Sequence, residues 1–250
     1  MLTEQIADGV FRVADGIVNW YLVTDGDTVA LYDAGWPRSW PRVQAALGEI
    51  GRAPGDIAGV VLTHAHPDHL GAAEVIRRRT GAAVHVHRPE LARARGKAPG
   101  SSPFTLVPAL VPTLWRPSAL AFVGEATVRG FMTPTWLAEG QTFEADTVLD
   151  VPGHPRAIST PGHTEGHVSF VFADRGVTIT GDAIATLDVL TRAAGPRVMP
   201  DQLNGDPAQT RASLEVLATQ ASGRLLPGHG EPTTGEPAEA VARARETDRD

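Results

Sequence analysis

The sequence predicts an α+β protein, because strand-like patterns fill two separate parts of the chain and helical patterns lie between and after them. Residues 10–32 contain three short strand-like runs, and residues 157–180 contain three more. The 250 residues, 42% of them hydrophobic, are enough for a sizeable core in one large domain or two small ones. The sequence has no internal repeat and no linker composition that would divide it.

The first strands are expected at residues 10–13, 18–24 and 28–32, where the composition and alternation of residues are typical of strands. A hairpin signal, Asp25-Gly26-Asp27, separates the last two. The third strand ends at Asp33, which is followed closely by glycine. Such a carboxylate is commonly a turn former, but it can also hold the outer ring nitrogen of a metal-bound histidine. The sequence leaves both roles of Asp33 open.

The densest group of reactive side chains lies between a strand and a helix. A helix is expected over residues 37–50, a buried strand over 56–62 and a second helix over 71–80. Four side chains that can bind metal follow this strand within six residues: His64, His66, Asp68 and His69. Because α/β proteins place ligands at the carboxyl ends of strands, the motif predicts a metal site.

The spacing divides this motif into two pairs. His64 and His66 lie two apart on an extended segment, point the same way and can chelate one metal ion. Asp68 and His69 are expected to start the following helix and to turn toward a second position. A polar loop with unrelated histidines is the alternative, but no packing requirement explains three imidazoles beside a carboxylate.

The next strand is expected at residues 82–87. His85 and His87 lie two apart in it, but no nearby group completes a metal site, so we interpret both as polar positions at a strand end. Residues 88–146 then form an apolar insertion with short helices, punctuated by proline. The insertion packs on the domain or on a second subunit, or it forms a lid over the site; both roles can hold at once.

The strand pattern returns after residue 147. The remaining strands are expected at residues 157–160, 168–173, 177–180 and 224–227. A helix is expected at 206–221, where aspartate followed by proline is a favourable start, and the last helix at about 237–249.

Three loops after these strands each offer one group that can bind metal: His163, Asp182 and His229. A glycine directly precedes each of them, which lets the backbone turn sharply and approach other groups closely. His167 begins the strand after His163, and we interpret it as a buried, hydrogen-bonded histidine without a ligand role.

The composition narrows the chemistry and the partners. The chain has no cysteine, so thiolate ligands and disulfides are excluded and any metal must be held by histidines and carboxylates. The net charge of −7 argues against general nucleic-acid binding. The N-terminus lacks the features of a signal peptide, and no run approaches the ~18 apolar residues of a membrane span. We expect a cytoplasmic protein with a small-molecule substrate and with neither nucleic acid nor membrane as a partner.

The order of these groups resembles that of one family, the metallo-β-lactamase superfamily in its general hydrolase form. That family has an aspartate at an early strand end, then His-x-His-x-Asp-His, then a histidine, an aspartate and a last histidine; here these are Asp33, residues 64–69, His163, Asp182 and His229. The resemblance covers nearly the whole chain and is weakest at 88–146. It implies one domain over residues 1–250 and an αββα sandwich of two mixed β-sheets flanked by helices.

The resemblance also implies two metal positions and their ligands. Those of the first metal would be His64, His66 and His163. Those of the second would be Asp68, His69 and His229. Asp182 would bridge both ions, and Asp33 would orient one of the ligands.

The implied cofactors are two Zn²⁺ ions, since five imidazoles and two carboxylates suit zinc without sulfur, with Fe or Mn as alternatives. A hydroxide that bridges the metals would attack an ester-like bond, because a metal lowers the pKa of bound water to about 7. Asp68 would also accept a proton, which makes it and Asp182 the expected catalytic residues. The implied function is binuclear hydrolysis of an ester, lactone or thioester.

Several branches of the family fit this sequence less well. The best-known β-lactamases use cysteine or lack the bridging aspartate, whereas this chain has no cysteine and has Asp182. Glyoxalase II enzymes have a helical domain after the last histidine, whereas only a short tail follows His229 here. Hydrolases of quorum-signal lactones place a tyrosine between positions equivalent to Asp182 and His229, where this chain has none.

Four alternatives stay open. Three are alternative functions: β-lactamase activity, a mononuclear iron oxygenase similar to the persulfide dioxygenases, and a non-catalytic binding module. The fourth concerns the oligomeric state, a homodimer formed through the apolar insertion. One iron per chain would identify the oxygenase, and full metal loading without hydrolysis would identify the binding module. The apolar insertion favours an acyl or aromatic ester or lactone as substrate.

Overall fold

The N-terminal part of the chain forms a seven-stranded mixed sheet whose strands lie in sequence order. The first four strands pair antiparallel, and β4 to β7 pair parallel. The strands are β1 (Thr3–Ala7), β2 (Val10–Asp15), β3 (Val18–Asp25), β4 (Thr28–Tyr32), β5 (Ile57–Val61), β6 (Ala83–His87) and β7 (Gln141–Phe143). This computed structural model describes residues 2–248, without the side chains of residues 106 and 107.

A second mixed sheet comes from the C-terminal part of the chain and has the order β13-β10-β9-β8. Strands β8 to β10 pair antiparallel, and β10 pairs parallel with β13. Its strands are β8 (Arg156–Ser159), β9 (Val168–Phe172), β10 (Val177–Gly181) and β13 (Arg224–Pro227). A separate ribbon consists of β11 (Ala185–Leu187) and β12 (Ala194–Arg197).

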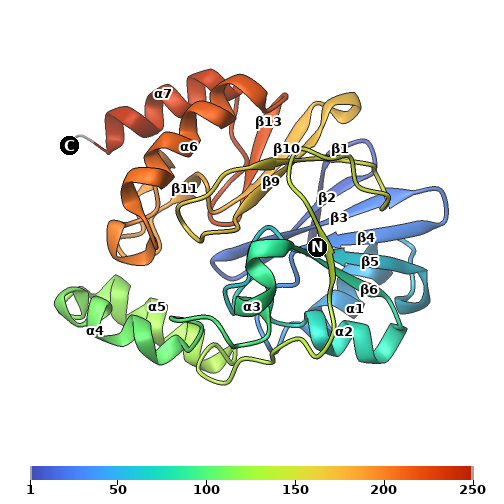
Figure 1. Cartoon of the computed structure of the whole chain (residues 1–250), viewed down its shortest axis with the longest axis horizontal. Helices are drawn as coiled ribbons and strands as arrows, with labels where there is room; N and C mark the ends of the chain where they lie inside the picture. The colour runs from blue at the N-terminus through green and yellow to red at the C-terminus, as the bar shows by residue number, and fades with distance from the viewer. Residues whose placement is uncertain (1, 249–250) are drawn as a thin grey trace.

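Helices cover the outer faces of both sheets (Figure 1). Buried residues of α1 and α2 pack on the first sheet, and those of α6 and α7 pack on the second. The helices are α1 (Trp40–Glu49), α2 (Ala73–Thr80), α3 (Leu91–Ala94), α4 (Val107–Leu110), α5 (Pro117–Val128), α6 (Pro207–Gln220) and α7 (Pro237–Thr247). The predicted α+β class and αββα sandwich are confirmed.

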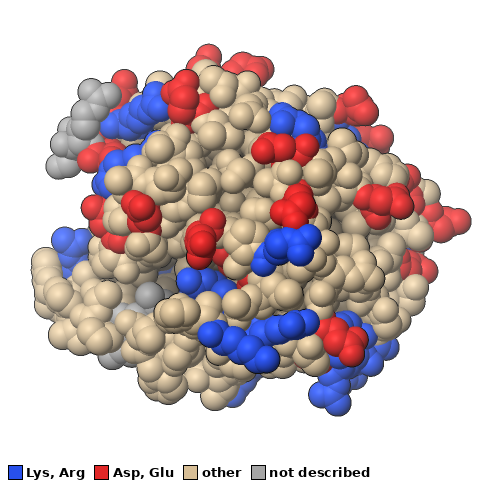
Figure 2. All heavy atoms as spheres, in the orientation of Figure 1, with Lys and Arg blue, Asp and Glu red and all other residues tan. Residues whose placement is uncertain are grey.

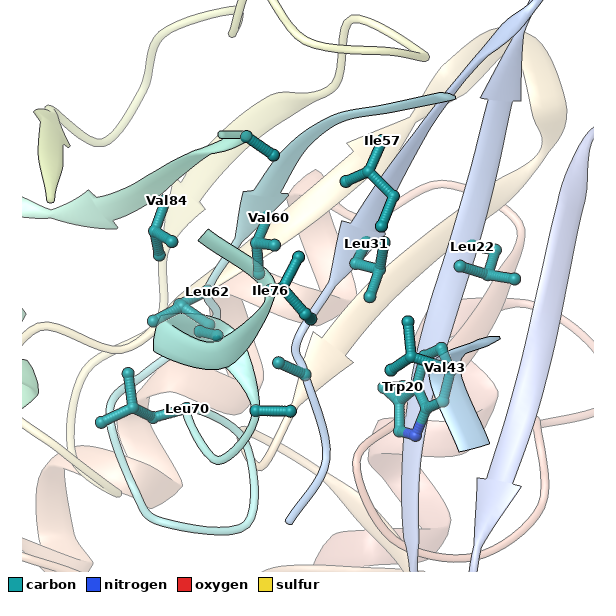
Figure 3. Close-up of a cluster of buried hydrophobic side chains, with 14 of the residues drawn as sticks. Trp20, Leu22, Leu31, Val43, Ile57, Val60, Leu62, Leu70, Ile76 and Val84 are labelled. Carbon is teal, nitrogen blue, oxygen red and sulfur yellow. The ribbon is translucent and has the colours of Figure 1, made fainter. Parts of the chain in front are cut away.

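The central strands of the first sheet are buried on both faces. On β3, Trp20 and Leu22 face the helices, where Figure 3 shows them among the apolar side chains of that layer. Tyr21 and Val23 point to the opposite face and pack in the cluster between the two sheets. Because successive side chains of a strand alternate between its faces, one apolar run supplies two layers of the core.

The segment expected to be an apolar insertion contains α3, α4 and α5 and then returns to the first sheet as β7. The three residues of β7 are too few to give a recognisable alternation, which explains why the sequence does not predict this strand. The lobe of α4 and α5 lies at the lower left in Figure 1 and is almost free of charged side chains in Figure 2. Five large apolar side chains are exposed on this part of the chain: Phe104, Val111, Trp115, Leu120 and Val128.

Several boundaries differ from the sequence-based expectation. Strand β1 is not predicted because it is an edge strand without buried positions, and β11 and β12 are very short. The helix after the histidine motif begins at Ala73, so the expectation that Asp68 and His69 start it is wrong. These two residues lie in a turn, closed by hydrogen bonds from the amides of His69 and Leu70 to the carbonyl of His66.

The last helix ends at Thr247, and residue 249, its expected end, lies outside the described residues. Among residues 2–248, the structure has no helix with the length and apolar character needed to cross a membrane.

Candidate metal centre

The side chains expected to bind metal, and Asp33, which is expected to orient one of them, lie on five loops that follow strands of both sheets. Asp33 follows β4 and the 64–69 motif follows β5, while His163, Asp182 and His229 follow β8, β10 and β13. The loops meet at one edge of the sandwich and form three groups of potential ligands. Within each group, the ligand atoms all lie within 4.8 Å of one another. The groups are His64, His66 and His163; His64, His69 and Asp182; and Asp68, His69 and His229.

Asp182 lies at the centre of this arrangement. Its Oδ2 is 3.3 Å from Nε2 of His163, 3.3 Å from Nε2 of His229 and 3.9 Å from Nε2 of His64. Its Oδ1 lies 3.4 Å from Nε2 of His69. The two oxygens of one carboxylate therefore face histidines of both expected ligand sets, which is the position required of a ligand shared by two metal ions.

The spacing of these atoms fits a metal site. Neighbouring ligand atoms around a tetrahedral zinc ion with bonds of ~2.1 Å lie about 3.4 Å apart. Asp68 Oδ2 lies 3.6 Å from Nε2 of His229 and 3.9 Å from Nε2 of His69, close to that value. Nε2 of His64, Nε2 of His69 and Oδ1 of Asp182 are buried without a hydrogen-bond partner. Buried polar atoms normally have one, and a bound metal ion would supply it.

Asp33 orients two of the rings from outside the centre. Its Oδ2 accepts hydrogen bonds from Nδ1–H of His69 and from the hydroxyl of Thr63, both at 2.8 Å. Thr63 Oγ1 in turn lies 3.0 Å from Nδ1 of His64. Both rings are thereby held with the proton on Nδ1 and the lone pair of Nε2 directed inward, as metal binding requires.

Other groups orient the remaining rings. Nδ1–H of His163 donates to the side-chain oxygen of Asn204 at 3.0 Å, and Nδ1–H of His229 donates to the carbonyl of Ile17 at 2.8 Å. His66 differs, because its Nδ1 faces the centre and lies 2.9 Å from Nε2 of His163. The sequence analysis did not identify Asn204 or Ile17, since no motif connects them to a histidine.

Burial keeps the first set of imidazoles neutral. It lowers the pKa of His64 and His66 well below the ordinary value, and neighbouring imidazoles lower both further. Burial also lowers the pKa of His163, although the charge of Asp182 opposes this effect. Because a metal ion binds the neutral form of imidazole, these three rings need not release a proton to become ligands.

Nearby carboxylates reverse the effect of burial on the pKa of the two histidines in the second ligand set, His69 and His229. Burial alone would lower the pKa of His69 and His229, but the charge of Asp182 and other carboxylates raises both. Burial alone would raise the pKa of Asp182, but attraction to His229 and His69 outweighs it and lowers that pKa well below its ordinary value. Asp182 is therefore an ionised carboxylate in a buried position, suited to binding a cation.

Glycine is required where the loops approach each other. A Cβ atom on Gly228 would lie only 2.3 Å from Oδ1 of Asp182 and 2.6 Å from Cε1 of His69. Gly181 has φ of +48°, and a Cβ atom there would lie 2.6 Å from the hydroxyl oxygen of Thr63. A larger residue at Gly228 would push candidate ligands apart, and one at Gly181 would displace Thr63, which orients His64.

Two further histidines have structural contacts. Nε2 of His167 accepts a hydrogen bond from the amide of Asp182 at 3.0 Å, and its Nδ1 lies 2.9 Å from Thr160 Oγ1. Burial lowers the pKa of His167 to about 3, so this ring stays neutral. His87 is also buried and hydrogen-bonds through Nδ1 to the carbonyl of Gly166.

Glu90 supports the centre in a way that the sequence does not reveal. It is buried, and its Oε2 and Oε1 accept hydrogen bonds from the amides of Ala65 and Gly166, each at 2.9 Å. Glu90 thereby joins the histidine motif to the loop that carries His163. A single glutamate in an arginine-rich segment forms no motif that would identify it.

We expect Glu90→Ala to weaken metal binding to the first ligand set by about 10- to 100-fold, as for other groups that position metal ligands. Two buried amides lose their acceptor, and both loops gain freedom. Glu90→Gln keeps one acceptor oxygen and should lose less. Calorimetric titration of the metal-depleted protein with zinc measures the effect, with the exposed Glu144→Ala as control. Unchanged affinity in Glu90→Ala would mean that the loops hold their positions without this carboxylate.

A hollow of about 370 Å³, counted with its opening to solvent, lies over the centre. Its polar lining consists of candidate ligands: His66, Asp68, His163, Asp182 and His229. Its apolar lining consists of Phe122, Phe131, Val189, Met199 and Leu203. The first two of these come from the apolar insertion, so that segment forms part of the wall over the centre.

Comparison with known proteins is consistent with this geometry. The family model of the metallo-β-lactamase superfamily matches residues 13–229. This span contains all the side chains of the candidate centre, from Asp33 to His229.

Two named relatives illustrate the similarity. The chain is 29% identical over 250 residues to the probable metallo-hydrolase YflN of Bacillus subtilis (strain 168), and the match covers 93% of this chain and 88% of that protein. It is 30% identical over 197 residues to the hydroxyacylglutathione hydrolase of Cereibacter sphaeroides (strain ATCC 17025), covering 76% of this chain and 58% of the relative. The chain therefore spans little more than half the length of that hydrolase.

Solved structures share the fold. A metallo-β-lactamase family protein from Thermus thermophilus superposes with a TM-score of 0.70 at 24% identity, over 97% of this chain and 79% of the other. TTHA1623, solved in a di-iron-bound form, superposes with a TM-score of 0.62 at 25% identity, over 94% and 98%.

Proposed function

The chain belongs to the metallo-β-lactamase superfamily, and on this basis we propose that it is a binuclear metallo-hydrolase that cleaves an ester, lactone or thioester bond. Its relatives include a probable metallo-hydrolase and hydroxyacylglutathione hydrolases, whose names support hydrolysis of an acyl compound. The proposed ligands of the first ion are His64, His66 and His163. Those of the second are Asp68, His69 and His229, with Asp182 shared by both.

The position of Asp182 is the observation that carries this proposal. A carboxylate that served one metal ion would face one set of ligands, whereas its two oxygens face His163 and His69 from different sets. Histidine and carboxylate ligands without sulfur suit zinc, although iron and manganese accept the same groups. Two such ions, when bound, would acidify water to give a nucleophile near neutral pH and would polarise the scissile carbonyl.

The chain's own groups have distinct tasks in this reaction. Hydrolysis adds the hydroxyl of water to the acyl carbon and a proton to the leaving atom. Asp68 faces the hollow and is placed to receive the proton released when water attacks. Phe122 and Phe131 shield the same space from bulk water, which strengthens electrostatic interactions inside it. Asp33 and Glu90 hold the ligand loops in place.

Metal content, measured by mass spectrometry on protein purified without added metal, tests the proposal. We expect about two zinc ions per chain and hydrolysis of some members of an ester, lactone and thioester panel. A chelator should abolish this hydrolysis and lower the Tm by on the order of 10 °C, because ions that bind only the folded chain stabilise it. Both effects should reverse when zinc is restored.

Two other outcomes would replace the proposal. About one iron per chain, with activity on a sulfur substrate and oxygen, would identify the mononuclear oxygenase. Two ions per chain without hydrolysis of any panel member would favour a binding module.

A further inference from the structure

We infer that the part of the substrate that enters the hollow over the metal centre is small, uncharged and apolar, such as a short alkyl or phenyl acyl group. This inference rests on the hydrolase function proposed above and names the substrate class of the same site. Three properties of the hollow support it: the chemistry of its wall, the lack of a spare charged partner, and its size.

The wall of the hollow is apolar wherever it is not a candidate ligand. One side consists of Phe122 and Phe131, and the other of Val189, Met199 and Leu203. These side chains belong to, or pack against, a single buried apolar cluster. An apolar acyl group that enters this space leaves water for an apolar surface, which is favourable.

No spare charge is available in the hollow. Among the residues that the structure describes, no arginine or lysine lines it, and its carboxylates are Asp68 and Asp182. Both carboxylates are proposed metal ligands. A carboxylate or ammonium on the substrate would lose its water there and meet no opposite charge from a side chain outside the ligand sets, and such burial is costly.

The wall is preformed. The hydroxyl of Ser118 on α5 donates a hydrogen bond to the carbonyl of Leu190 at 2.6 Å, which joins the two sides. Phe131 packs edge to face against the buried Trp36, with ring centres 6.1 Å apart. The volume of about 370 Å³ includes space outside the opening, and the space open to the centres of water molecules is only about 30 Å³, so only a small group such as a short chain or a single ring enters.

Arg93 is the strongest candidate for an anion-binding group nearby, because its charge contributes to lowering the pKa of His66. It lines a different hollow, of about 790 Å³, together with Glu165 and Asp206. Its guanidinium also lies 3.9 Å from the carboxylate of Glu90. The carboxylate of Glu90 offsets part of its charge, and two further acidic side chains line this second hollow, which therefore does not favour an anionic group.

A matched pair of esters tests the inference. The acyl groups of 4-nitrophenyl butyrate and 4-nitrophenyl hemisuccinate have similar length but end in a methyl and a carboxylate. With the zinc-loaded enzyme, we expect kcat/KM for the butyrate to be higher by on the order of 100-fold, because the ester carbonyl takes the place at the metals and no cationic side chain in the wall pairs with the carboxylate at the far end of the acyl group. The rates of both esters in alkaline solution without enzyme correct for their intrinsic reactivity.

A charge placed in the wall should change this preference. Leu203 is half-buried in the wall, and we expect Leu203→Arg to raise the hemisuccinate-to-butyrate ratio by about tenfold or more. Leu120→Arg is the matched control, since Leu120 is 54% exposed and does not line the hollow. If Leu203→Arg fails to fold, Phe122→Ala is the second variant. It removes part of the wall, which enlarges the hollow, and it should shift the preference toward longer neutral acyl chains.

The outcomes separate the two proposals. Similar kcat/KM values for both esters, or a hemisuccinate preference that Arg93→Gln removes, would overturn the inference and leave the hydrolase function intact. Lack of hydrolysis of these esters and of the wider panel by protein with two zinc ions would overturn the hydrolase function and the inference with it.

Discussion

Replacing Asp182 with alanine is expected to lower kcat/KM by a factor on the order of 1,000 or more and to remove most of the bound metal. Its two oxygens face both ligand sets, at 3.3 Å from His163 and 3.4 Å from His69, so the substitution weakens both metal positions at once. It also removes the buried negative charge that would balance the two proposed cations. Hydrolysis of the best panel substrate and metal content by mass spectrometry measure the two effects.

The fold should largely survive this substitution. The side chain of Asp182 belongs to none of the apolar clusters, and its amide keeps the hydrogen bond to His167. Asp174→Ala, in the exposed turn before β10, is a matched control that should retain activity and metal. Circular dichroism and thermal unfolding verify folding. Near-normal turnover in Asp182→Ala with unchanged metal content would show that the centre is wrongly assigned.

Replacing His66 with alanine is expected to lower kcat/KM by about 100-fold or more but to leave about one metal ion per chain. The first ligand set loses the ring whose Nδ1 faces the centre, whereas Asp68, His69 and His229 keep the second set. This partial loss distinguishes the variant from Asp182→Ala. Metal content and kcat are measured on the same preparation.

His85→Ala is the control for this experiment. His85 lies on β6, which precedes the insertion, and belongs to none of the groups of potential metal ligands found among the described residues. It should retain full activity and about two ions per chain. Loss of both ions in His66→Ala would mean that the two positions do not bind independently. Full activity with two ions would remove His66 from the proposed ligand set.

Local patterns in the sequence were sufficient to identify the side chains that meet at the centre and, through their order, the resemblance to the family, which in turn implied the sandwich. His64 and His66 are separated by one residue on an extended segment, so their side chains must point the same way wherever that segment lies. His163, Asp182 and His229 each follow a strand that composition reveals. Short or exposed strands such as β1 and β7 were missed, because they contribute few or no buried positions to a pattern.

The tertiary structure alone decided how the centre is supported and what faces it. Glu90 lies 25 and 76 positions from the amides it holds, and Ile17 lies 212 positions from His229. The apolar wall combines Phe122 with Met199, which are far apart in the sequence and pack in one cluster. The periodicity of apolar residues indicates which face of a helix or strand is buried and where that element ends. The contacts named here form only when elements distant in the sequence pack together, and no local pattern encodes such a pairing.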